Sequence, residues 1–301
     1  MDKLRQVASS GSGVVHYEVE NHSHVGEALE MFRKTNAEAI VIIGGQALAS
    51  AAFEYLIEKN PFEGKLPPLA VLPGGDNNII AENMGALTES PHRELARLLK
   101  RRKAGKMLNN TLSLPLIKVE GAHGVGMVYG LYFCCGGVTG DKRAFNCPIA
   151  GNSLFKSLAR RLFSIGFIRQ ASVKALKDKD MQKTVRVVLS ERGAVVGRYY
   201  MICITTLSMI MMGARLPRLE HEGKIHYLSI ENTSDALFSV GKQLLRGRFK
   251  GKDLPGQVLR EIGHARIVQN GPFVVDGSFF EAEKDGELMI SSTARLSFLK
   301  L

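Results

Sequence analysis

A glycine pair directly follows each of two short apolar runs, and this repeated pattern constrains the fold more than any other feature. The runs are "EAIVIIGG" at 38–45 and "PPLAVLPGG" at 67–75, and helical spacing of apolar residues follows each of them. A glycine turn between a strand and a helix lets a phosphate approach the backbone, and the helix N-terminus offers free N–H groups. At the ends of parallel strands, such turns lie at the sheet edge where ligands bind.

The first hundred residues alternate between strand and helix patterns. We expect strands at 13–20, 38–45 and 67–73, and helices at 24–36, 46–59 and 90–105. Ser90 is the expected N-cap of the last helix, with Pro91 at its first position. This alternation predicts a parallel sheet with helices on both faces.

Beyond about residue 105, strand-like runs dominate and helical patterns remain only at 153–176 and 234–247. Many short strands with turn signals predict a mostly antiparallel second domain. The apolar stretch at 199–213 is too short to span a bilayer and reads as a buried strand with its exit. The predicted fold is a Rossmann-like parallel α/β nucleotide domain at 1–104, followed by a β-rich, sandwich-like domain at 105–301.

Composition narrows the possible partners. The formal net charge of +11 indicates an anionic partner such as a nucleotide, an anionic membrane or nucleic acid. Nucleic acid is the weakest of these, because no recognition motif is present and aromatic residues are not interleaved with the basic runs. The cysteines have no CxxC spacing, so we expect buried, reduced thiols rather than a zinc site; they are Cys134, Cys135, Cys147 and Cys203.

Several segments, in order along the chain, resemble the catalytic domain of diacylglycerol and sphingosine kinases, which is related to NAD kinases. The two glycine turns resemble the GGDGT and PLGTxND turns of that family. "YGLYFCCGGVTG" at 129–140 is similar to its Y-F-x-N-x-x-G-x-G strand, "HEG" at 221–223 to its DDG and "DGS" at 276–278 to its DGE. The family's opening strand with its NPxSG loop has no clear counterpart, although "SSGSG" at 9–13 resembles a remnant.

The resemblance implies ATP and Mg²⁺ as cofactors, a nucleotide and a lipid as partners, and a cytoplasmic protein that works at the inner membrane face. It implies that the nucleotide lies against Gly44, Gly45, Gln46, Gly74, Gly75, Asn77 and Asn78. The catalytic positions it implies are Asp76, Glu222 and Ser278. The metal positions are Asp76, Glu222 and Asp276.

The departures from the family pattern are at positions that bind metal or phosphate or that act as the general base. Gln46 stands where the family has a carboxylate, and a neutral amide is a poorer Mg²⁺ ligand. Asp76 stands where the family offers a hydroxyl, and its charge repels a polyphosphate unless a cation lies between them. Ser278 replaces the glutamate that takes the proton from the lipid hydroxyl, and serine is a poor general base.

Two functions therefore stay open. One is a divergent lipid kinase that phosphorylates a diacylglycerol-type hydroxyl, with Asp76 or Glu222 holding Mg²⁺. The other is a catalytically inactive pseudokinase that binds lipid, nucleotide or a protein partner. The amphipathic segment 153–167 also has two interpretations, as a helix lying on an anionic membrane or as a helix that covers the β-rich domain.

Overall fold

The computed structural model describes residues 2–75, 78–140, 184–190, 193–210, 213–283 and 286–301. Asp76, Asn77 and Cys147 lie outside these ranges, as do the helix expected at 153–176 and its amphipathic part 153–167. Within the described part of the chain, none of the helices has the length and apolar character needed to span a bilayer.

The N-terminal half is an α/β unit, as predicted. Strands β1 (Ile40–Ile43) and β2 (Leu69–Leu72) pair in parallel, with Ile40 opposite Leu69. Its helices are α1 (Asp2–Ser9), α2 (Val25–Lys34), α3 (Gln46–Lys59), α4 (Ile79–Asn83) and α5 (Pro91–Lys103), with a 3₁₀ turn at His22–His24. The sequence pattern did not predict α1 or α4.

Helices cover both faces of this small sheet, and β2 is therefore buried along its whole length. On one face, Phe53 of α3 lies in the same apolar core as Ile40 and Ile42. On the other face, Leu95 of α5 packs with Leu72 and with α1. The expected alternation of layers is therefore confirmed.

The strand expected at 13–20 is wrong. The segment is extended but pairs with no strand in the part of the chain that the structure describes. Its first residues lie instead against α5, where Arg102 Nη1 donates to the Gly13 carbonyl at 3.4 Å and Val14 packs with Leu95. Alternation of apolar and polar residues indicates that one side of a segment is buried. It does not show that the segment has a neighbouring strand with which to pair.

The C-terminal half consists of two mostly antiparallel sheets, also as predicted. The first has the order β12-β11-β8-β5-β14-β15. These strands are β5 (Tyr132–Cys135), β8 (Tyr199–Thr205), β11 (Ile225–Glu231), β12 (Gln257–Ile262), β14 (Pro272–Val275) and β15 (Ser278–Glu281). Helix α7 (Ser234–Arg246) covers its outer face, with Leu237 and Val240 in one core with Leu228.

The second sheet has the order β1-β2-β16-β13-β6-β7, with β3 pairing both β16 and β4. Its further strands are β3 (Thr111–Glu120), β4 (Met127–Gly130), β6 (Val185–Leu189), β7 (Gly193–Gly197), β13 (His264–Val268) and β16 (Glu287–Leu299). The core between the two sheets includes Ile117, Phe133 and Ile267. A separate short hairpin joins β9 (Met209–Ile210) to β10 (Ala214–Arg215), and a 3₁₀ turn spans Gly137–Gly140.

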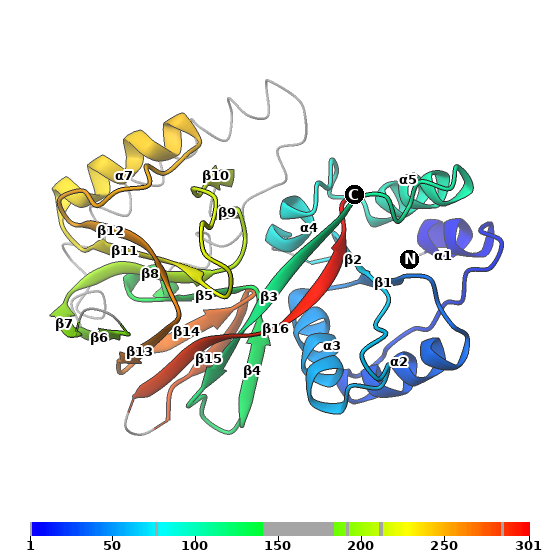
Figure 1. Ribbon diagram of the computed structural model, residues 1–301, viewed down its shortest axis with the longest axis horizontal. Helices are drawn as coiled ribbons and strands as arrows, with labels where there is room; N and C mark the ends of the chain where they lie inside the picture. Colours follow the sequence, from blue (N-terminus) through cyan, green and yellow to red (C-terminus); the bar gives the residue numbers. More distant parts are fainter. Residues whose placement is uncertain (1, 76–77, 141–183, 191–192, 211–212, 284–285) are drawn as a thin grey trace.

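The long strands β3 and β16 connect the two halves (Figure 1). Phe298, near the end of β16, pairs in parallel with Leu69 of β2, so one sheet extends from the α/β unit into the β-rich half. The domain boundary at 104 stays a prediction.

The cysteines in the described part of the chain are free and buried, as expected, and β8 is buried along its whole length. Burial raises the pKa of Cys134 to about 12. Its thiol is therefore protonated and unreactive at neutral pH.

Candidate functional site

The structure brings the two glycine turns into direct contact at the carboxyl ends of β1 and β2. A Cβ on Gly74 would lie 2.7 Å from the backbone nitrogen of Gly44, and a Cβ on Gly75 would lie 2.9 Å from the Cα of Gly45. No side chain fits at either position unless the backbone moves. Glycine is required here for the approach of one turn to the other, whatever ligand the turns also bind.

The first turn leads into a helix whose N-terminus is open. Gly45 is the N-cap of α3, the first turn of α3 carries no acidic residue, and Gly45 and Ala47 are exposed. The 14 residues of α3 give a full macrodipole, and its N-cap residue, Gly45, has no side chain to cap the first N–H groups. This end of α3, which begins at Gln46, can accept an anion.

The second turn is closed by its own asparagine. Asn78 Oδ1 accepts hydrogen bonds from the backbone N–H of Gly74 at 3.1 Å and of Gly75 at 3.4 Å. These are the N–H groups that a phosphate-binding turn would offer to its ligand. Asn78, predicted to face the nucleotide, thus also holds the turn in shape.

Asp276 lies in the turn of the β14–β15 hairpin, and its side chain is buried rather than solvated. With φ of 48° at Asp276 and 92° at Gly277, and Val275 opposite Ser278, the turn is of the two-residue type I′ kind. Its Oδ1 accepts from the N–H of Tyr132 at 2.8 Å and of Leu131 at 3.0 Å, and Oδ2 lies 3.1 Å from the latter. Asp276 therefore fixes the chain between β4 and β5.

Burial determines the ionisation of this carboxyl. Asp276 is 0% exposed, and burial raises its pKa to about 7, although the two backbone N–H groups favour the charged form. Both oxygens already have partners, so a metal role for Asp276 stays a prediction that would require these bonds to open. Ser278 follows at the start of β15, half-buried.

The structure holds Glu222 in an exposed loop whose described contacts all lie in the C-terminal half. The N–H groups of Glu220 and His221 donate to the Glu261 carboxylate of β12 at 2.6 and 3.1 Å. On the other side, the Gly223 carbonyl accepts from Ser292 of β16 at 2.8 Å. These contacts do not connect Glu222 to the glycine turns.

Glu222 and Asp276, the predicted metal ligands that the structure describes, belong to no group of metal-binding side chains within the described ranges. Across the described ranges, no three His, Cys, Asp or Glu side chains are grouped so that they could hold an ion. Asp76 belongs to the residues outside those ranges, so its part in a metal site stays a prediction.

Two contacts that no sequence pattern predicted join the two halves, one at the end of α4 and one at the C-terminal end of α3. Asn83, at the end of α4, accepts from the N–H of Met209 at 2.8 Å and donates to its carbonyl at 3.0 Å. Tyr129 of β4 donates to Glu58 of α3, and burial, together with this bond, raises the pKa of Tyr129 to about 12. Asn83 belongs to no motif, and Tyr129 opens the segment 129–140 without any signal in that pattern for a contact with Glu58.

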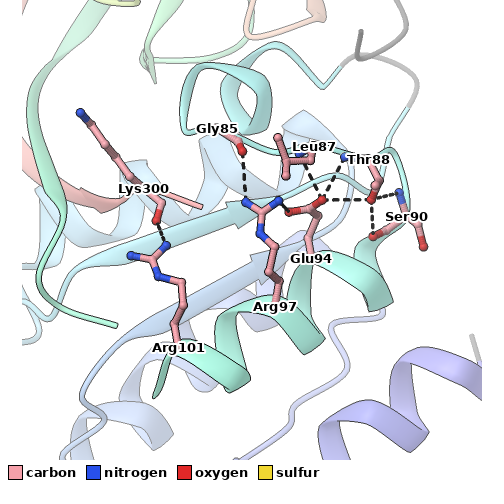
Figure 2. A network of polar contacts seen from close by, with 8 residues as sticks. All are labelled: Gly85, Leu87, Thr88, Ser90, Glu94, Arg97, Arg101 and Lys300. Carbon is pink, nitrogen blue, oxygen red and sulfur yellow. Dashed lines mark hydrogen bonds and ion pairs between the residues drawn. The ribbon is translucent and has the colours of Figure 1, made fainter. Parts of the chain in front are cut away.

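A polar network on α5 fixes the segment that leaves α4 (Figure 2). The buried Glu94 accepts from the N–H groups of Leu87 at 3.1 Å and Thr88 at 2.9 Å. Arg97 pairs with Glu94 and donates to the Gly85 carbonyl at 3.2 Å. Ser90 precedes α5 as predicted, but its hydroxyl contacts the His92 ring and does not cap a backbone N–H.

Comparisons with known proteins agree with this architecture. Residues 3–108 match the family model of the diacylglycerol kinase catalytic domain. No curated protein matches the sequence.

Among solved structures, a protein from Bacillus anthracis str. Sterne assigned as a diacylglycerol kinase matches with a TM-score of 0.62 and 10% identity, over 100% of this chain and 90% of that chain. A second diacylglycerol kinase structure from that organism matches with a TM-score of 0.58 and 10% identity, over the same shares. An NAD kinase from Archaeoglobus fulgidus in complex with ATP has a TM-score of 0.43 and 11% identity, over 94% and 90%. Residues 3–108 thus match the diacylglycerol kinase catalytic domain, and the chain as a whole has the fold of the diacylglycerol kinase structures.

Proposed function

We propose that this is a lipid kinase-like protein that binds the phosphates of a nucleotide at the N-terminus of α3, and that it has lost most of the transfer from ATP to a lipid hydroxyl. The observation that carries the proposal is that, at two catalytic motifs, side chains already accept hydrogen bonds from the backbone N–H groups. Asn78 occupies the N–H groups of the second glycine turn, and Asp276 occupies those of Leu131 and Tyr132.

The chemistry of phosphoryl transfer supports this assignment. The reaction depends on positioning and on neutralising the charge of the phosphates, which Mg²⁺ supplies in kinases. Of the residues predicted to hold Mg²⁺, Asp276 is buried with both oxygens bonded to backbone N–H groups, and the loop of Glu222 is fixed to β12 and β16. The described carboxylates therefore do not fit the ion, and Gln46 adds no carboxylate to them.

Ser278, at the position of the general base, is also poorly suited to its role. Ser278 makes no side-chain hydrogen bond to a carboxylate or imidazole of any residue that the structure describes. Without such a partner, serine does not take a proton from a lipid hydroxyl at neutral pH. Nucleotide binding, by contrast, needs only the open N-terminus of α3.

The nucleotide site is tested at Ala47, the exposed second residue of α3. Ala47→Glu places a negative charge in the first turn, where it favours the helix but repels a phosphate. We expect ATP affinity, measured by equilibrium dialysis, to fall about tenfold. The matched control Ala47→Gln has the same length without the charge and should bind as the wild type does; equal affinity in all three proteins would exclude this site.

Transfer is tested separately with labelled ATP, Mg²⁺ and a panel of lipids that includes diacylglycerol. We expect the wild type to transfer no more phosphate than Asp76→Asn or Glu222→Gln, while it still binds ATP. Glu220→Gln, in the same loop as Glu222, is the control. Wild-type transfer that falls about tenfold or more in either of the first two variants, and not in the control, would instead identify a divergent lipid kinase.

A further inference from the structure

A row of exposed cations follows the outer face of α7 and continues into the loop after it. Phe238, Lys242 and Arg246 lie at helical spacing on that face, and all three are exposed. In the loop, Arg248 and Lys250 point outward while Phe249 between them is buried. We call this region the basic surface; it consists of Arg215, Phe238, Lys242, Arg246, Arg248, Lys250 and Lys252.

The loop holds its cations on a fixed backbone. Gly247 ends α7 in the left-handed region, and Phe249 packs into the core beneath α7. The Phe249 N–H donates to the Arg215 carbonyl at 2.8 Å, and the Lys250 N–H donates to buried Gln243 at 2.9 Å. Arg215 and Arg248 are direct bridge partners, so their side chains start from neighbouring backbone positions.

The cations surround a shallow hollow of about 580 Å³, and none of the described residues that line it carries a carboxylate. Arg246, Arg248, Lys250 and Lys252 line it together with Gln243, Phe249 and Gly251. The nearest acid along the chain, Asp253, is paired with Arg260. Within the described ranges these four cations have no ion-pair partner, so their charge is available to an external anion.

An exposed aromatic residue lies on α7 beside Lys242, two helical turns before Arg246. Phe238 is 64% exposed, and Lys242 Nζ lies 4.3 Å from the centre of its ring. A large apolar side chain exposed to water on a helix that also carries exposed cations is typical of surfaces that lie in the headgroup region of a membrane. A soluble anion would need only the cations, so its binding would not explain why the Phe238 ring is exposed.

We infer that the basic surface docks the protein on an anionic lipid bilayer, with Phe238 entering the headgroup region and the cations contacting lipid phosphates. The inference rests on the proposed function for the choice of a lipid partner. The fold connects this surface to the glycine turns, because the Phe249 N–H bonds to β10, β9 pairs with β10, and β9 is bonded to Asn83 of α4. Figure 1 shows α7 and α4 on the same upper side of the molecule.

The first test compares binding to vesicles of phosphatidylcholine with and without phosphatidylglycerol, by sedimentation and without any nucleotide. Arg246→Glu/Arg248→Glu should lower partitioning to the anionic vesicles by about tenfold or more, because each cation near the surface adds to the attraction. The control Lys100→Glu/Lys103→Glu makes the same charge change at exposed positions of α5, at the other end of the molecule. An equal loss in both variants would show only an effect of net charge and would overturn the inference.

The second test uses the absence of tryptophan from the sequence. Phe238→Trp introduces a single tryptophan, whose emission should shift to shorter wavelength on the anionic vesicles. Val196→Trp, at a 63% exposed position of β7, is the control and should show no shift. No shift at position 238, or equal shifts at both, would contradict docking through α7.

The outcomes separate docking from the proposed function. Wild-type protein that binds duplex DNA but not the anionic vesicles would overturn the inference. Protein that docks through α7 but does not bind ATP would support the inference and remove the nucleotide-binding part of the proposed function. Both tests need only the folded full chain.

Discussion

Replacing Asp276 by alanine is expected to lower the free energy of unfolding by about 3 kcal/mol, because the backbone N–H groups of Leu131 and Tyr132 lose their acceptor inside the protein. Urea denaturation followed by circular dichroism measures the change. Ser278→Ala, at the half-buried position two residues later, is the control and should cost less than about 1 kcal/mol. Similar small losses in both variants would mean that water replaces the carboxylate.

The same carboxyl should make stability depend on pH. Its pKa is raised from 3.8 to about 7 in the folded protein, so between these values the folded state keeps a proton that the unfolded state has lost. The contribution of Asp276 is therefore full below about pH 4 and declines as the pH rises to about 7, by at most about 1.4 kcal/mol per pH unit.

Asp276→Asn provides the matched comparison. Asparagine tolerates the positive φ at this position and its side-chain oxygen can still accept from both N–H groups, but it does not titrate. The difference in stability between wild type and Asp276→Asn should change with pH between about 4 and 7 and be constant above that range. Parallel pH profiles for the two proteins would contradict the raised pKa.

Gly74→Ala has the second large expected effect. The added Cβ would lie 2.7 Å from the backbone nitrogen of Gly44 and 2.9 Å from its Cα, so the two glycine turns must separate. We expect a loss of about 2–3 kcal/mol in the free energy of unfolding, the range for an overpacked site that cannot relax through a flexible side chain. Urea denaturation is again the measurement.

Gly45→Ala is the control for this effect. A Cβ on Gly45 meets nothing within 4 Å, and its φ of −67° is open to any residue. Its stability should change by less than about 1 kcal/mol. If the two variants lost stability equally, the contact between the turns would not be the reason for glycine at position 74.

Apolar spacing and turn residues in the sequence correctly predicted helix α3 and strands β1 and β2. The helix expected at 46–59 is α3 with the same bounds, because regular apolar spacing follows a glycine that can serve as N-cap. The strands expected at 38–45 and 67–73 contain β1 and β2. The segment 13–20 failed because a strand also needs a partner edge, and only the assembled sheet determines which edges remain.

For the candidate site, too, the sequence predicted the features that follow from local patterns and not the contacts between distant residues. Parallel strands with glycine turns predict that the turns meet, and Gly44 and Gly74 do meet. The burial of Asp276 against Leu131 and Tyr132 could not be predicted, because these residues are far apart in the sequence and come together only through β5 and β14. The contact of Asn83 with Met209 is equally non-local.

The pairing of β16 with β2 has a consequence for the order in which the protein is made. The apolar strand β2 leaves the ribosome early, whereas its partner Phe298 is synthesised after every other described strand has been made. Until then, one edge of β2 is unpaired, and exposed strand edges of this kind promote aggregation. We therefore expect the α/β unit to be held by a chaperone during translation, and residues 1–104 made alone to collect in the insoluble fraction.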